Sequence, residues 1–68
     1  MKITVTMVPS KTNKEIKIPK GSTVTDLLEK MQLKPDTVIV LRENTPIPID
    51  DILNNDQQLQ VIQVASGG

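Results

Sequence analysis

The sequence contains no cysteine, no histidine and no aromatic residue. The lack of cysteine excludes disulfides, thiolate nucleophiles and zinc knuckles, and the lack of histidine excludes imidazole bases and histidine-ligated metals. Without aromatic side chains there is no stacking platform for single-stranded nucleic acid, and a net charge of 0 argues against a phosphate-binding surface. We therefore expect a chain that is not an enzyme by itself and that binds no metal, cofactor or nucleic acid.

The 68 residues are enough for one small domain, with a single core of Ile, Val, Leu and Met. The N-terminal residues 1–8 are apolar but alternating, so they lack the continuous run of a signal peptide or a membrane span. We expect a cytoplasmic monomer that does not associate with membranes.

Charge is balanced over the whole chain but not along it. Residues 1–20 carry a net charge of +4 and residues 21–68 carry −4. One interpretation is a solvated basic hairpin beside an acidic half. The alternative is that the acidic half steers the protein toward a basic groove on a partner.

The N-terminal third has the period of two strands. Residues 2–8 alternate, with Ile3, Val5 and Met7 on one face, and residues 14–18 alternate again, so residues 1–18 are typical of a hairpin. The next apolar residues have helical spacing: Val24, Leu27, Leu28 and Met31. Thr23 and Asp26 have the spacing of a capping box, and the helix must end before Pro35.

Strand patterns return in the second half. The nearly continuous apolar run over residues 37–41 predicts a central strand, or a strand whose second face is also partly covered. It leaves open whether Ile39 and Leu41 or Val38 and Val40 face outward. Residues 45–48 can form only a short edge segment because they contain two prolines. We expect Asp50 to cap a helical turn over residues 51–53. Residues 58–64 form the last predicted strand, with Leu59 and Val61 facing the helix.

The order β-β-α-β-β-β predicts an α+β fold in which one helix packs across one face of a mixed sheet of four to five strands. We expect residues 1–64 to form this domain and residues 65–68 to form a flexible tail ending in Gly67-Gly68. Such a pair can have no function, either because small residues at a terminus fray or because the two glycines were added to the end of the chain. It can also be functional, because a terminal glycine presents an unhindered carboxylate and two glycines pass through a narrow channel.

The whole pattern resembles the β-grasp, ubiquitin-like sulfur carriers, which include ThiS, MoaD and the archaeal small modifier proteins. The resemblance rests on the element order, the helix start at residues 23–28, the turn at Asn55-Asp56 and the end of the chain at residues 64–68. Asn55 departs from the family, which usually has glycine there, but asparagine tolerates positive φ.

The resemblance implies roles for the last four residues. Gly68 would be adenylated by a ubiquitin-activating-type adenylyltransferase that uses ATP and magnesium, and a sulfur donor would convert it to a thiocarboxylate. A downstream enzyme would then use that sulfur for thiamine, molybdopterin or tRNA thiolation. In the modifier branch of the family, Gly68 would instead be joined to lysines of target proteins. Gly67, Ser66 and Ala65 would lie in the activating enzyme.

The last strand also offers a candidate recognition patch. If Leu59 and Val61 face the helix, then Gln60, Ile62 and Val64 lie on the open face of the sheet, where an apolar cluster marks a partner site. The alternative is that these are isolated exposed aliphatics. The adjacent Asp50 and Asp51 could bind a hard cation, but we interpret them as a cap beside a solvated charge. Three functions remain open: sulfur carrier, which we favour, protein modifier, and a β-grasp interaction module with an incidental Gly-Gly.

Overall fold

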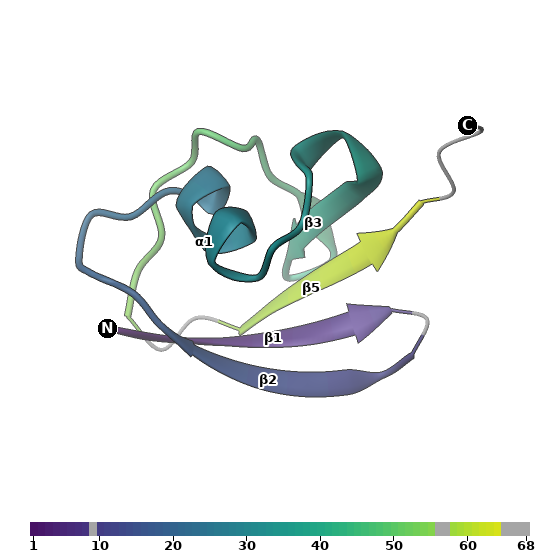
Figure 1. Cartoon of the computed structure of the whole chain (residues 1–68), viewed down its shortest axis with the longest axis horizontal. Helices are drawn as coiled ribbons and strands as arrows, with labels where there is room; N and C mark the ends of the chain where they lie inside the picture. The colour runs from purple at the N-terminus through teal and green to yellow at the C-terminus, as the bar shows by residue number, and fades with distance from the viewer. Residues whose placement is uncertain (9, 56–57, 65–68) are drawn as a thin grey trace.

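The computed structural model describes residues 1–8, 10–55 and 58–64. In this part of the chain one mixed sheet is covered on one face by a single α-helix (Figure 1). The strands are β1 (Lys2–Val8), β2 (Thr12–Lys17), β3 (Val38–Arg42), β4 (Thr45–Pro46) and β5 (Gln58–Gln63). Their order is β2-β1-β5-β3-β4, and only β1 and β5 pair in parallel. The predicted α+β arrangement is confirmed.

The hairpin of β1 and β2 follows from the alternation in the sequence. In the register of the hairpin, Lys2 lies opposite Lys17 and Met7 lies opposite Thr12. Ile3, next to Lys2 on β1, is buried on the inner face. The turn is closed by the Lys11 N–H, which donates to the Met7 carbonyl at 2.7 Å. Period-two burial along β1 thus places one face of the hairpin in the core.

The helix α1 (Val24–Lys30) begins with the predicted capping box. The side chain of Thr23 accepts from the Asp26 N–H at 3.3 Å, and the Asp26 carboxylate accepts from the Thr23 N–H at 2.9 Å. The helix ends before Pro35, as expected, because Gln32 takes a φ of 60° and the Leu33 N–H bonds back to the Leu28 carbonyl. This is the bond pattern of a Schellman motif.

A short 3₁₀ helix, η1 (Pro35–Thr37), which the sequence pattern did not predict, leads into β3. The described part of the chain contains no helix with the length and apolarity that a membrane crossing requires.

The core lies between α1 and the inner face of the sheet, and apolar side chains from β1, α1, β3, β5 and the segments beside them contribute to it. Its buried members are Ile3, Val5, Met7, Ile18, Val24, Leu27, Leu28, Val38, Val40, Leu53, Leu59 and Val61. Because no aromatic side chain is present, this core is made of many small contributions, each of which stabilises the fold by about 1.5–3 kcal/mol when fully buried.

The helical turn predicted over residues 51–53 is wrong, and Asp50 caps nothing there. The Asp51 carbonyl accepts from the Val24 N–H at 3.0 Å, and the Leu53 N–H donates to the Ser22 carbonyl at 2.9 Å. Ile52 forms an isolated antiparallel bridge with Thr23. Since these backbone groups bond to the start of α1, they are not available for local helical bonds.

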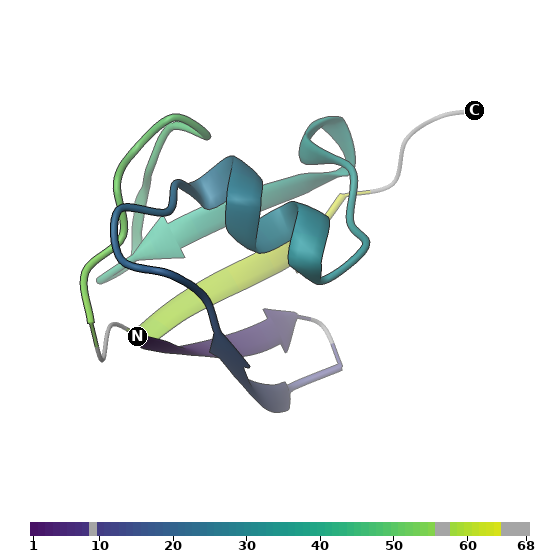
Figure 2. The same ribbon diagram turned by 60° about the vertical axis from the view of Figure 1, so that its left-hand side comes forward.

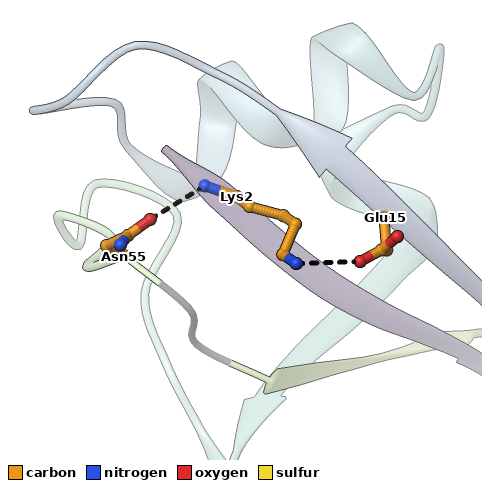
Figure 3. Close-up of polar contacts among 3 residues, drawn as sticks. All are labelled: Lys2, Glu15 and Asn55. Atoms are coloured by element: carbon orange, nitrogen blue, oxygen red, sulfur yellow. Dashed lines mark hydrogen bonds and ion pairs between the residues drawn. The ribbon is translucent and has the colours of Figure 1, made fainter.

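Asn55 lies at a position where the resembling family usually has glycine, and we expected its role to be the toleration of a positive φ. Its role in the structure is different. Asn55 is not among the described residues with positive φ. Its side-chain Oδ1 instead accepts from the backbone N–H of Lys2 at 3.0 Å (Figure 3). The Lys2 ammonium, on the same strand, pairs with Glu15 at 3.1 Å. Asparagine therefore ties the turn to the beginning of β1, which glycine cannot do.

Candidate functional site

The end of β5 is where the chain leaves the sheet, and it is fixed at a defined point. The Val64 N–H donates to the Thr37 carbonyl at 3.0 Å. Thr37 is itself held, because its N–H and its Oγ1 both donate to the Lys34 carbonyl, at 3.0 and 2.8 Å. The predicted reactive tail, Ala65, Ser66, Gly67 and Gly68, lies outside the described residues.

Beside this exit the open face of the sheet, opposite α1, carries a row of aliphatic side chains. Ile62 on β5 lies between Val8 on β1 and Ile39 on β3. Ile39 is 42% exposed and Val64 is 37% exposed, while Val8 and Ile62 are half-buried. We call these four residues, Val8, Ile39, Ile62 and Val64, the exit patch.

The structure answers the question that the apolar run in β3 left open. Val38 and Val40 are buried at 8% and 4% exposure, so Ile39 and Leu41 face outward. The register decides this, because Val40 pairs with the buried Val61 and so must share its face. The prediction that Val61 and Leu59 face the helix is confirmed by their burial.

Gln60 marks the boundary between two parts of the open face. It lies opposite Thr6 and Leu41 and is half-buried. Beyond Gln60, away from the exit, there is a hollow of about 500 Å³, lined by Thr6, Arg42, Glu43, Asn44, Gln58, Leu59 and Gln60. The open face is therefore apolar at the end where the tail leaves and polar at the other end. Sequence reasoning missed Val8 in the patch, although the alternation of β1 places it outward.

The adjacent carboxylates at positions 50 and 51 behave differently from each other. An Arg42 guanidinium nitrogen lies 2.8 Å from the Asp51 carboxylate, and both side chains are about two-thirds buried. The expectation of a cap beside a solvated charge is therefore wrong for Asp51, which is the partner of an ion pair that ties its loop to β3. Residues 1–8, 10–55 and 58–64 contain no cluster of three His, Cys, Asp or Glu side chains that could hold a metal ion.

Known proteins share both the sequence pattern and the fold. The family model of small archaeal modifier protein 2 matches residues 1–65. An uncharacterized protein of Archaeoglobus fulgidus is 34% identical over 56 residues, which cover 81% of this chain and 82% of that one. The sulfur carrier protein TtuB of Thermus thermophilus is 27% identical over 55 residues, covering 81% and 85%.

Among solved structures, the ubiquitin of Caldiarchaeum subterraneum superposes with a TM-score of 0.75 at 18% identity, covering 100% of this chain and 98% of that one. At this identity the likeness shows the fold alone, which is therefore the ubiquitin-like β-grasp. The family match covers nearly the whole chain, and its description is that of a small modifier protein. The chain belongs to the small archaeal modifier protein 2 family.

Proposed function

We propose that the protein is a sulfur carrier whose Gly68 carboxylate is activated by a separate enzyme and converted to a thiocarboxylate. The observation that carries the proposal is the exit of β5: Val64 is held by Thr37 at the border of the exit patch, four residues before Gly68 in the sequence. The similarity to a sulfur carrier of Thermus thermophilus supports the same function.

The chemistry requires only a carboxylate from this chain. A Gly68 oxygen attacks the α-phosphorus of ATP, pyrophosphate leaves, and an acyl adenylate forms. Hydrosulfide from the sulfur donor then attacks the carbonyl carbon, AMP leaves with the bonding electron pair, and the proton on sulfur passes to water, which leaves a thiocarboxylate. ATP and magnesium belong to the activating enzyme, a ubiquitin-activating-type adenylyltransferase. We propose that this takes place in the cytoplasm, on a monomeric carrier.

The exit patch would be the surface that the activating enzyme recognises. Burying the exposed part of Ile39 and Val64 against an enzyme supplies binding energy of about 25 cal/mol per Å² of apolar surface. Gln60 lies at the border of the exit patch, where its amide can donate hydrogen bonds to the enzyme and accept them from it. Docking there would bring the tail toward the nucleotide, with Ala65, Ser66 and Gly67 as the segment that passes into the enzyme.

The second candidate function is a covalent protein modifier, which the matched family model favours by its description. In that case a lysine amine of a target protein attacks the activated Gly68 carbonyl, and an isopeptide bond replaces the bond to the leaving group. Both functions require the same activation, and they differ in the nucleophile that follows.

The test is an intact mass spectrum of the protein purified from its own cells, with peptide mapping of residues 59–68. A mass increase at Gly68 that corresponds to exchange of oxygen for sulfur is the expected result. An unmodified terminus, together with Gly-Gly remnants on lysines of other proteins, would establish the modifier instead. If neither forms after incubation with ATP, an activating enzyme and a sulfur donor, the remaining function is that of an interaction module.

A further inference from the structure

A second exposed apolar surface lies on the loop that follows β4. Within the described residues, the two most exposed large hydrophobic side chains are Ile52, at 58%, and Ile49, at 48%. Both contact the same turn of the chain: Ile52 bridges to Thr23, and the Ile49 carbonyl accepts from Thr25. The backbone of both isoleucines is therefore bonded to the start of α1, while their side chains are exposed to solvent.

The loop that carries these isoleucines is fixed on both sides. Ile49 receives two hydrogen bonds from Thr25, from its N–H and from its Oγ1, both at 2.9 Å. The Asp51 carboxylate is paired with Arg42, and Leu53 is buried in the core at 2% exposure. Because the backbone is already ordered, a partner that covers Ile49 and Ile52 pays little loop entropy on binding.

The segments that carry the isoleucines contain only acidic charged residues, and the one cation paired with them in the described part of the chain, Arg42, comes from β3. Residues 22–26 and 47–53, which pack against each other here, contain Asp26, Asp50 and Asp51 but no lysine or arginine. Arg42 compensates Asp51, whereas Asp50 makes no ion pair with any residue that the structure describes. We call Asp26, Ile49, Asp50 and Ile52 the loop surface: two exposed aliphatic side chains on segments that also carry two carboxylates, neither of which has a cationic partner among the described residues.

The loop surface is remote from the site proposed for activation. In Figures 1 and 2 the loop after β4 lies toward the left of the molecule and the end of β5 toward the right, in two orientations 60° apart. A partner on the loop surface would leave the exit patch and the tail free for the activating enzyme.

We propose that the loop surface is a docking site for a second protein that presents an aliphatic side chain flanked by lysine or arginine. Charge complementarity selects the class of partner: cationic side chains approach Asp26 and Asp50 while the aliphatic side chain covers Ile49 and Ile52. This interaction is independent of the fate of Gly68, so it stands whether the chain carries sulfur or modifies proteins.

The test uses the full chain labelled with ¹⁵N and a synthetic peptide of isoleucines flanked by lysines. We expect amide shifts confined to residues 22–26 and 47–53, with saturation as peptide is added. Ile52→Ser should weaken binding about tenfold, since it removes one side chain's apolar contact. Asp50→Lys should weaken it several-fold and reduce its dependence on salt.

Two matched controls decide the outcome. A peptide with every lysine replaced by glutamate should bind at least about tenfold more weakly, because it faces Asp26 and Asp50 with like charge. Ile39→Ser makes the same substitution on the exit patch and should leave binding of the lysine peptide unchanged. Equal binding of both peptides, shifts centred on the exit patch, or no saturable shifts at all would overturn the proposal.

Discussion

The exit patch and the loop surface expose similar aliphatic side chains, but different physical constraints hold them in place. Ile39 and Ile62 are fixed by the register of the sheet, in which a slip by one residue would bury them and expose Val40 and Val61. Ile49 and Ile52 lie in no strand, and hydrogen bonds to the start of α1 hold them. Exposure on the sheet is thus a consequence of pairing, whereas exposure on the loop depends on a few separate bonds.

The largest expected effect on activation comes from changes to the tail, beside the exit patch and remote from the loop surface. Deleting Gly68 should abolish adenylation, because the reactive carboxylate would move to Gly67, one residue closer to the fixed Val64. The melting temperature should stay the same, since no residue of the core is touched. Measurements are ATP–pyrophosphate exchange with the activating enzyme and thermal denaturation. An extra alanine after Gly68 should have the same effect, and normal activation of either variant would contradict the proposed function.

The same substitution at the two surfaces should separate their roles. We expect Ile39→Ser to lower kcat/KM for activation about tenfold, because it removes an apolar contact of the exit patch. Ile52→Ser, on the loop surface, should leave kcat/KM unchanged. The comparison breaks down if both variants lose activation equally, in which case the activating enzyme would cover both ends of the molecule.

Two ion pairs offer a smaller test of how firmly the loop is held. Arg42→Met should lower the free energy of unfolding by about 1 kcal/mol, because it leaves the half-buried Asp51 without its partner. Lys2→Met removes the pair with Glu15, whose side chains are 48% and 63% exposed, and should cost less than about 0.5 kcal/mol. Urea denaturation measures both values. Equal losses would mean that the loop does not depend on Arg42.

Another small effect is expected at Asn55, just beyond the loop. Asn55→Gly restores the residue typical of the resembling family but removes the acceptor for the Lys2 N–H, so we expect a loss of about 0.5 kcal/mol. Asn55→Asp keeps an oxygen at this position and should retain most of the stability. A glycine variant more stable than the parent protein in urea would show that the backbone there prefers the conformation of glycine.

The sequence predicted most of the fold because its periodicities are local. Alternation in residues 2–8, helical spacing from Val24 to Met31 and the capping pair Thr23 and Asp26 each act within a few residues. The outward face of β3 was not predictable, because four consecutive aliphatic residues carry no alternation and only pairing with β5 selects Ile39.

The loop was the part that local rules described wrongly. Asp50 suits a helix cap, but the bonds from Val24 to Asp51 and from Leu53 to Ser22 are contacts between distant segments, which no local pattern encodes. Of the predicted site, Gln60, Ile62 and Val64 are placed by the structure, whereas residues 65–68 lie outside the described part of the chain. Their role rests on the chemistry of a terminal glycine and stays a prediction.

The parallel pairing of β1 with β5 has a mechanical consequence. Thr4 lies beside Gln58 and Val8 beside Ile62, so the first and last strands are neighbours that run in the same direction. Tension between Met1 and the C-terminus would pull these strands past each other along their length, and the hydrogen bonds between them would share the load and break together rather than one by one. A pull on the tail alone would first meet the bond from Val64 to Thr37. The domain should therefore resist being drawn apart by its ends more strongly than its modest size suggests.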